Sequence, residues 1–469
     1  MDTQIVSTPI GDFKGRTFAW NGENVDLACA AISSGFTTVP LSNDNEVVPK
    51  ELLEAINTLQ CGTSVITQTG IPTVNEFRRI AQAVAENGSI VRLALKEYSY
   101  DDVDHGVHLL SSFSLALPSF AGPHSKIHTL NVSYQANHFG DFFMPLEELD
   151  RTFSENVANF IRQQPSLKTL HIQYSAADHF NLVLEALGGN TTLTSLNISE
   201  CLLTEETTAM FVNLLPQMSS LKNLRMDSSF FLIPTNGTTL IQFEDSYRRF
   251  CEILGINTTI QNLSLKYAKL GCNNLALLGT ALASNETLVS LNLGSTGVED
   301  GCATNGGLFE SIAANTSIKN LYLAGNNLTS AGLMSLLEHT LTRPTGLDKL
   351  DVSSNRRVVI ENKDRAFTTI MDMIDIQTLT LKTLTLYDDY GHRFNKVDKD
   401  AAATISAKIA LVWKTRAKAA KHIKKAWQIC RWDPSFKICE KVQMRNLEDE
   451  IGPAGMASLF TETQMLFCL

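Results

Sequence analysis

The sequence of 469 residues lacks the features that mark membrane spans and disulfide-rich domains. Its nine cysteines are scattered and form no CxxC pair, so neither a zinc site nor a disulfide framework is indicated, and a reducing compartment is expected. No run of about eighteen apolar residues occurs, and the N-terminal residues lack the basic start and apolar stretch of a secretory signal. We therefore expect no transmembrane segment.

Motifs for catalysis and cofactor binding are also missing. The chain has no glycine-rich phosphate loop, no GxSxG elbow and no HExxH helix. Half of its ten histidines lie between residues 105 and 138, beside acidic residues, but nothing in their spacing brings them together as metal ligands. These histidines are His105, His108, His124, His128 and His138. The sequence thus predicts no enzyme, no metal and no cofactor.

Positive charge is scarce except in one segment. The net charge of −10 argues against a nucleic-acid-binding protein, which needs a basic surface. Residues 395–446 carry thirteen Lys or Arg and four Asp or Glu, a balance of +9, which leaves −19 for the rest. The composition therefore changes near residue 393, and this basic segment is treated separately below.

What the sequence does contain is a repeat. Apolar residues recur at relative positions 1, 4 and 6, most clearly in LVSLNL (288–293), IKNLYL (318–323) and LDKLDV (347–352). We count about twelve copies, including a degenerate one at Cys61 that divides the long gap between the first clear copies. The copies begin at residues 36, 61, 90, 127, 167, 193, 221, 260, 288, 318, 347 and 381.

Each part of the repeat has a physical interpretation. The alternating apolar residues predict a short strand with one buried face. Asn326 follows such a strand and can bond to backbone groups at a turn, while Leu333, Leu336 and Leu337 have helical spacing. A unit of about 28 residues cannot bury its own apolar face, but a stack of units can. The sequence therefore predicts an α/β solenoid.

The stretches Leu-Tyr-Leu-x-x-Asn-x-Leu (321–328) and Leu-Asp-Val-x-x-Asn (350–355) resemble the leucine-rich repeat family, and the repeat length resembles its ribonuclease-inhibitor type. The resemblance implies a horseshoe, with a parallel sheet on the concave face and helices on the convex face. It divides the chain into an N-terminal cap (1–35), the repeats (36–392) and a basic helical tail (393–469). Several copies replace the turn asparagine, and we expect looser turns there. The replacements are Tyr98, Gln135, Ser175, Cys201, Ser229, Ala268 and Thr296.

Asn-x-Ser/Thr triplets are frequent, and some fall within predicted strands, as at Asn131, Asn197 and Asn262. Glycosylation at these positions would block the concave face. We interpret the triplets as a product of Asn- and Thr-rich repeats.

The concave face is the predicted binding site. Residues at positions 3, 5, 7 and 8 of each copy point away from the helices, and they include aromatic, Arg and acidic residues of the kind that protein interfaces use. An alternative is that the tyrosines at position 8 merely flank the sheet. The repeats that start at residues 90, 127 and 221 hold aromatic insertions of about ten residues, which either bind the partner or cover the core. The predicted partner-binding residues are Arg92, Tyr134, His171, Tyr174, Arg225, Asp227, Tyr267, Tyr322, Asp351 and Tyr387.

Residues 401–432 are rich in Ala and Lys and predict one amphipathic helix that ends before Pro434. Its apolar side includes Trp413, Ile423 and Trp427. Such a helix binds calmodulin-like proteins or an anionic membrane surface, or it caps the exposed core of the last repeat. The sequence leaves both roles open.

The acidic cluster Glu448, Asp449 and Glu450, followed by an apolar end, resembles the C-terminal translocation signals of type IV secreted bacterial effectors. This resemblance implies a virulence effector, secreted into host cytosol, that binds a host protein or a co-delivered effector. The alternative is a eukaryotic-type cytosolic regulator that acts through its basic tail. In both cases we expect a non-enzymatic protein that works by binding.

Overall fold

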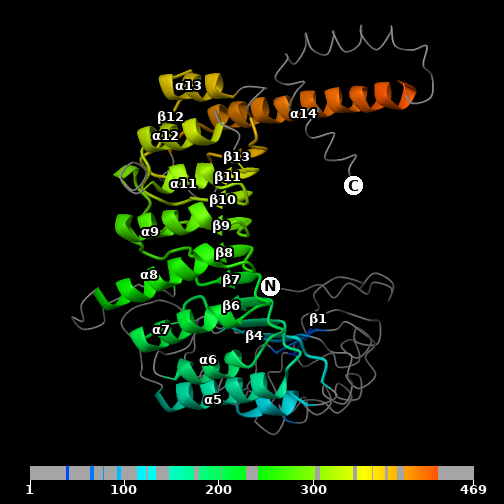
Figure 1. The fold of residues 1–469 in the computed structure, drawn as a ribbon, viewed down its shortest axis with the longest axis vertical. Coiled ribbons are helices and arrows are strands. Elements are labelled where there is room, and N and C mark those ends of the chain that lie inside the picture. Colours follow the sequence, from blue (N-terminus) through cyan, green and yellow to red (C-terminus); the bar gives the residue numbers. More distant parts are fainter. Residues whose placement is uncertain are drawn as a thin grey trace, which may run out of the picture. The chain divides into compact units, whose positions relative to one another are not determined.

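The computed structural model of the chain describes its strands, most of its helices and the turns between them. The residues described are 38–41, 64–67, 78, 92–96, 114–122, 125–133, 147–173, 179–201, 203–228, 241–301, 307–341, 346–361, 363–374, 379–387 and 396–430. The chain divides into two compact units, Met1–Arg249 (unit 1) and Phe250–Leu469 (unit 2), and the boundary between them falls within the sequence of helix α8 (Ile241–Ile256). Strands and helices alternate along the chain (Figure 1).

Unit 1 holds a parallel sheet with its strands in sequence order. The strands are β1 (Thr38–Leu41), β2 (Ser64–Thr67), β3 (Arg92–Lys96), β4 (Thr129–Ser133), β5 (Thr169–Gln173), β6 (Ser195–Asn197) and β7 (Asn223–Arg225). Helices α5 (Glu147–Gln163), α6 (Phe180–Gly188) and α7 (Glu205–Leu214) cover one face of this sheet, together with the 3₁₀ helices η2 (Leu117–Phe120) and η3 (Leu215–Gln217).

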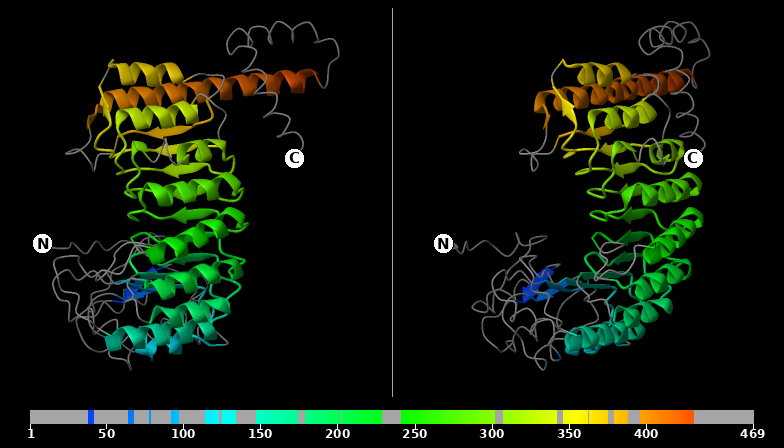
Figure 2. Two further views of the ribbon diagram at one scale, coloured as in Figure 1. Left: turned by 60° about the vertical axis from the view of Figure 1, so that its left-hand side comes forward. Right: turned by 90° about the vertical axis from the view of Figure 1, so that its left-hand side faces the viewer.

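Unit 2 repeats the pattern with β8 (Asn262–Ser264), β9 (Ser290–Asn292), β10 (Asn320–Tyr322), β11 (Lys349–Asp351) and β13 (Thr383–Thr385). Its covering helices are α9 (Gly271–Ser284), α11 (Leu308–Ala314), α12 (Ser330–Leu341) and α13 (Arg365–Met373). A short pair, β12 (Val359–Ile360) and β14 (Lys396–Val397), forms a second parallel sheet, and helix α14 (Lys399–Cys430) follows it. Figure 2 shows the helices of unit 2 side by side on one face of the strands.

The register explains how repeats that cannot fold alone form a core. Leu291, Leu321, Leu350 and Leu384 are aligned across neighbouring strands, and each is at most 3% exposed. Burying one such leucine stabilises the fold by about 1.5–3 kcal/mol. A strand lies in every predicted copy of the repeat, including the degenerate one at Cys61. The predicted α/β repeat solenoid with a parallel sheet is therefore confirmed.

The asparagine after the strand links adjacent repeats. Asn326 is 2% exposed, and its Oδ1 accepts from the backbone N–H groups of Thr296, Gly297 and Val298 at 2.9–3.0 Å. Its Nδ2 donates to the carbonyl of Leu293 in the preceding repeat, at 2.8 Å. All of the amide's bonding capacity is therefore used inside the protein.

Two of the replaced turn asparagines are not loose, and that expectation is wrong for them. The Cys201 thiol lies 3.5 Å from the Ile172 carbonyl, and the Thr296 hydroxyl donates to the Leu293 carbonyl at 2.7 Å. Both side chains are fully buried. A small side chain with one donor thus satisfies a carbonyl at the turn in place of the asparagine amide.

A second set of asparagines accounts for four of the Asn-x-Ser/Thr triplets. Asn190, Asn257, Asn285 and Asn315 each lie between a helix and the next strand. Each Oδ1 accepts from the N–H groups two and three residues later, for example Thr287 and Leu288 for Asn285. Asn285 and Asn315 are at most 5% exposed. At these two positions the triplet is a buried turn motif, which agrees with the interpretation from the sequence.

Helix α14 covers the end of the sheet in unit 2. Residues 401–419 bury Ala401, Ile405, Ile409 and Val412 against the last repeat. The Trp413 indole donates to the Leu381 carbonyl at 2.8 Å, and Arg416, Ser406 and Lys408 donate to the carbonyls of Leu379, Leu384 and Met371. These donors satisfy carbonyls at the β13 edge of the sheet, the last strand in its described order. This part of the predicted helix is a cap.

The cysteines and histidines only partly follow the sequence analysis. Cys272 is disulfide-bonded, which the scattered cysteines did not predict, whereas Cys201 and Cys251 are free. Within the described ranges no group of three or more His, Cys, Asp or Glu is placed to hold a metal ion. None of the helices searched in those ranges is long and apolar enough to cross a bilayer.

Candidate binding face

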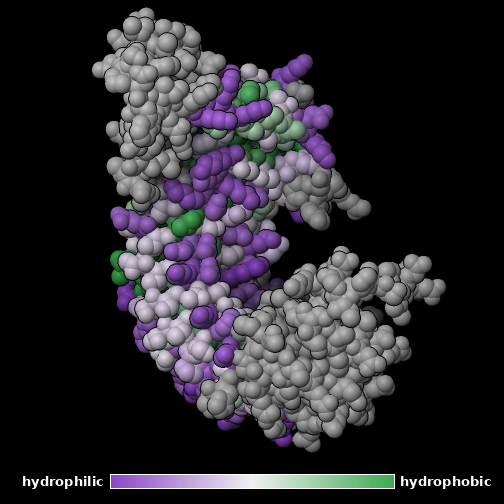
Figure 3. Space-filling view, turned by 90° about the vertical axis from the view of Figure 1, so that its right-hand side faces the viewer, coloured by the Kyte–Doolittle hydropathy of each residue, from purple (hydrophilic) through white to green (hydrophobic). Residues whose placement is uncertain are grey.

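The candidate site is the face of each sheet that the helices leave uncovered, called here the open face. It presents the side chains at positions 3, 5 and 7, because neighbouring residues of a strand alternate between faces. The burial pattern of β6, β9 and β10 shows this alternation, with a buried leucine between two half-buried polar residues. Where the structure describes it, this face is mostly hydrophilic (Figure 3).

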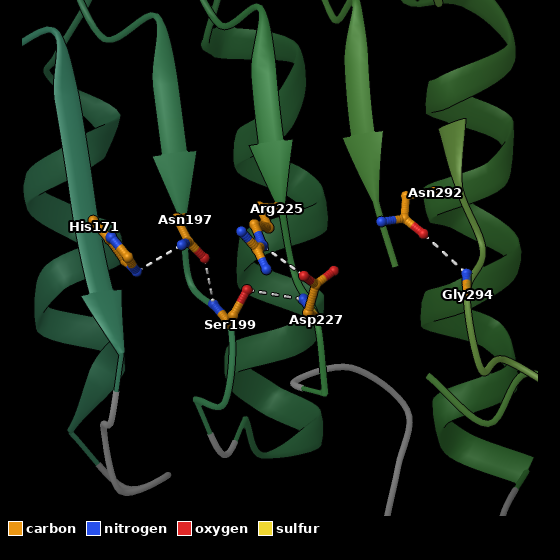
Figure 4. A network of polar contacts seen from close by, with 7 residues as sticks. All are labelled: His171, Asn197, Ser199, Arg225, Asp227, Asn292 and Gly294. Atoms are coloured by element: carbon orange, nitrogen blue, oxygen red, sulfur yellow. Dashed lines mark hydrogen bonds and ion pairs between the residues drawn. The ribbon is translucent and has the colours of Figure 1, made fainter. Parts of the chain in front are cut away.

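A chain of polar contacts crosses the open face of unit 1 (Figure 4). Asn197 Nδ2 donates to His171 Nε2 at 2.6 Å, and its Oδ1 accepts from the N–H group of Ser199 at 2.9 Å. The Ser199 hydroxyl in turn accepts from the N–H group of Asp227 at 3.0 Å. Side chains of β5 and β6 and of the turns that follow are therefore held in fixed positions relative to one another.

Arg225 and Asp227 end this chain as an ion pair. The Arg225 Nε atom lies 2.5 Å from Asp227 Oδ2. The Asp227 side chain is only 6% exposed, whereas Arg225 is 59% exposed. Arg225 thus compensates a buried carboxylate with one edge of its guanidinium and leaves much of the group accessible to a partner.

Tyrosine and lysine side chains pair on the open face of unit 2. The Lys266 ammonium lies 4.6 Å from the centre of the Tyr267 ring, and the Lys349 ammonium lies 4.9 Å from the Tyr322 ring. A third pair joins Tyr387 to Lys399 at the start of α14, at 5.6 Å. Each contact contributes about 0.5–1 kcal/mol at an exposed site. The rings are therefore held by neighbours while one face remains available.

Between the first two pairs the open face is built from small residues. Strand β9 contributes Ser290 and Asn292, and Gly294 follows it. A methyl group on Gly294 would lie only 3.2–3.3 Å from Asn292 Oδ1, the Ala324 carbonyl and the Lys266 side chain. Asn292 Oδ1 accepts from the Gly294 N–H group at 3.0 Å (Figure 4). The short side chains of β9 and Gly294 therefore leave a shallow depression in the open face between Tyr267 and Tyr322.

Tyr267 combines a bulky, exposed side chain with a backbone conformation that favours glycine. Its φ angle is +64°, in the left-handed region, and 50% of its surface is exposed. Among the repeats in which position 8 is described, six adopt this conformation, at Glu200, Ser228, Tyr267, Ser295, Gly325 and Ser354. The N–H group of Tyr267 bonds to the Gly294 carbonyl at 2.8 Å, a backbone contact that any residue can make. A bulky residue in this conformation costs about 1–2 kcal/mol relative to glycine.

The structure brings only some of the predicted site residues together. His171, Arg225 and Asp227 share the open face of unit 1, while Tyr322 and Asp351 occupy paired positions of β10 and β11. Arg92 lies in β3, although its side chain is not described, and Tyr134 and Tyr174 lie outside the described residues, as do the three insertions over most of their length.

Of the three predicted binding residues in the tail helix, the structure describes the side chain of one. Trp413 packs in the cap, where Lys382 and Arg416 lie 5.4 and 5.1 Å from its ring centre. Ile423 and Trp427 belong to α14, but their side chains are not described. The contacts of Trp413 with Lys382 and Arg416 were not predicted from the sequence, and neither were the contacts of Lys266 and Lys349 with tyrosine rings.

A cavity of about 850 Å³ lies in unit 1, at the start of β4 and β5. Lys126, His128, Lys168 and Gln164 line it. Burial, together with the positive charge of Lys168, lowers the pKa of His128 below its ordinary value near 6.5. Among the described residues that line it there is no carboxylate, no cysteine and no second histidine. The described part of the cavity therefore has no pair of groups for acid–base or nucleophilic catalysis.

Fold and face together define a class, the α/β repeat solenoid with an exposed, polar and partly aromatic sheet. No protein-family model matches the chain, and no curated protein matches it either. Among solved structures, the chain is similar to actin-binding site 2 of leiomodin-1, with 18% identity and a TM-score of 0.29. That match covers 38% of this chain and 95% of the leiomodin chain. Similarity at this level assigns no function or partner.

Proposed function

We propose that the chain is a non-enzymatic interaction protein of the leucine-rich repeat type that binds a protein partner through the open face of its sheet. The observation that carries the proposal is Tyr267. The fold gains little from a half-exposed aromatic ring on left-handed backbone, where serine, glycine or glutamate occupies the equivalent position in the other repeats described. Local strain of this kind is concentrated at functional sites.

The other contacts on the open face support binding rather than catalysis. Tyr and Arg side chains dominate the energetics of protein interfaces, Tyr because its rigid ring provides a large contact area and Arg because its planar guanidinium donates several hydrogen bonds. Tyr322 is already fixed by Lys349, and Arg225 by Asp227. A partner therefore meets side chains that lose little conformational entropy on binding.

The experiment is an affinity capture from eukaryotic cytosol with identification of the bound proteins. The test variant is Tyr267→Ser/Tyr322→Asn, which installs residues that the repeats already use at these positions, as at Ser295 and Asn292. The matched control is Ile256→Asn/Lys269→Ser, two exposed residues away from the open face. Interface aromatics cost about 2 kcal/mol or more when truncated, so we expect affinity to fall by at least about 30-fold for the test variant only.

A partner that binds wild type and the test variant equally would refute this use of the open face. Circular dichroism and thermal melts of both variants separate loss of binding from loss of fold. Cys430, the last residue of α14, is followed by Arg431 and is the cysteine chosen to test for a catalytic thiol. Hydrolase or transferase activity abolished by Cys430→Ala would refute the non-enzymatic part of the proposal.

The finer proposal is that the chain is a bacterial effector delivered into host cytosol, where the partner is a host protein or a co-delivered effector. It rests on the resemblance of the acidic and apolar C-terminal residues to type IV translocation signals. The test fuses a reporter enzyme to the chain and follows its delivery from a bacterium with that secretion system. Delivery should stop when residues 448–469 are removed, and unchanged delivery would refute the proposal.

A further inference from the structure

The outward side of helix α14 is a separate surface that the open-face proposal does not use. Lys414, Lys418 and Lys421 are exposed, and their spacing of four and three residues places them on one side of the helix. The distance along the axis from the first to the last is about 10 Å. Leu411, three residues before Lys414, is 62% exposed on the same side. This lysine row and its leucine therefore face solvent together.

The cap fixes which side of α14 faces outward. Ile405, Ile409 and Val412 are buried on the opposite side, and the Trp413 and Arg416 side chains bond to carbonyls of the last repeat. Figures 1 and 2 show the helix across the end of unit 2, with its C-terminal part running beyond the repeats. The lysine row is thus held in place on a rigid support and needs no rearrangement to meet a partner.

Beyond its first turn, which holds Asp400, the helix carries no negative charge. Residues 401–432 include eight Lys or Arg and no Asp or Glu, in a chain whose net charge is −10. Ala417, the exposed residue between Lys414 and Lys418, is small, and so is Ala410 just before the row. The acidic residue of the helix, Asp400, lies about 20 Å along the axis from Lys414, so neither negative charge nor a bulky neighbour beside the row keeps the three ammonium groups from a surface.

We propose that this row binds the anionic surface of a lipid bilayer, with α14 lying in the plane of the membrane. Three charges in a straight line meet a flat surface simultaneously, whereas a protein partner would need acidic groups at matching positions. Lysine is a compact point charge without the planar geometry that gives arginine its bidentate specificity, which suits a fluid array of headgroups. Leu411 supplies an apolar contact at the lipid interface.

The test is flotation of the full-length protein with phosphatidylcholine vesicles that contain either no anionic lipid or about 30% phosphatidylserine. We expect binding only to the anionic vesicles, and weaker binding as salt rises. Each lysine near such a surface contributes about fivefold, equivalent to ~1 kcal/mol. Lys414→Ala/Lys418→Ala/Lys421→Ala should therefore reduce partitioning by about 100-fold.

The matched control is Lys222→Ala/Lys269→Ala/Lys363→Ala, which removes the same charge from exposed positions elsewhere. It should bind anionic vesicles like wild type. Equal losses in both variants, or equal binding to neutral vesicles, would overturn the proposal. So would an absence of vesicle binding together with capture of an acidic calcium-binding protein through the same three lysines. The open-face proposal stands or falls separately, because its variants leave α14 unchanged.

Discussion

Gly332 offers a sharp test of how the repeats are joined, because a single methyl group there meets the carboxylate of another repeat. Gly332 is buried in the first turn of α12. A Cβ atom on Gly332 would lie 2.6 Å from Asp300 Cγ and closer still to Oδ1. Asp300 accepts from the Thr329 N–H group at 3.0 Å and from its hydroxyl at 2.5 Å. Gly332→Ala therefore displaces a carboxylate that holds the start of this helix.

The magnitude follows from these two bonds. A hydrogen bond to a charged group contributes about 1.5–3 kcal/mol, so the displacement removes about 3–6 kcal/mol. The higher helix propensity of alanine offsets about 1 kcal/mol of this loss. Hydration of the displaced carboxylate offsets a further part of it. We expect Gly332→Ala to lower the free energy of unfolding by about 2–4 kcal/mol. For a unit of this size the Tm should fall by roughly 5–15 °C.

The assay is urea denaturation followed by circular dichroism, supported by calorimetry. In the Asp300→Ala background only a Cβ atom remains near the new methyl group, at 3.4 Å. Gly332→Ala should then be neutral or stabilising by up to about 1 kcal/mol. Gly189→Ala, where the nearest atom lies 4.0 Å away, serves as the permissive control. An equal loss with and without the Asp300 carboxylate would refute the reasoning.

Three further predictions concern the turns, the cavity and the cap. Asn285→Ala removes an amide that accepts two backbone N–H groups and donates to the preceding repeat, so urea denaturation should show a loss of about 2–4 kcal/mol. Lys168→Ala should raise the pKa of His128 in an NMR titration, and an unchanged pKa would contradict the assigned cause. Because the pKa is lowered in the folded state, protonation favours unfolding, and the contribution of His128 to stability falls as the pH drops below about 6.5. Trp413→Phe should destabilise by about 1–2 kcal/mol because a carbonyl loses its donor, while Leu411→Ala, at an exposed position, should change stability by less than about 0.5 kcal/mol.

The repeat architecture was predictable because its signals are local and recur many times. Apolar positions 1, 4 and 6 are buried in or beside the strands, as at Leu321 in β10 and Leu323 directly after it, and Asn326 occupies the predicted turn. Repetition compensates for weak copies, so even the degenerate copy at Cys61 contains a strand. Tertiary packing in a solenoid involves mostly neighbouring repeats, so few long-range contacts had to be inferred.

The details of the candidate site were harder to predict from the sequence. The left-handed conformation at position 8 follows from a backbone bond to the next repeat, and residues as different as Glu200 and Tyr267 adopt it. The residue type at position 8 therefore does not indicate that its backbone is left-handed. The Tyr322–Lys349 pair joins residues of different repeats, and its geometry depends on strand register. The disulfide at Cys272 could not be inferred from scattered cysteines, since pairing depends on distances that only the fold sets.

The asparagines before the strands give the solenoid a direction. Asn285 donates to the carbonyl of Leu254, and Asn315 donates to the carbonyls of Leu282 and Asn285. Each of these repeats therefore supplies hydrogen-bond donors to carbonyls of the repeat before it. If one repeat is removed between two such asparagines, the remaining asparagine amide still finds an equivalent carbonyl in the repeat that now precedes it. Chains of this kind can grow or shrink by whole modules during evolution, while a cut within a module leaves buried groups without partners. The same rule gives a protein engineer the permitted sites for inserting or deleting repeats.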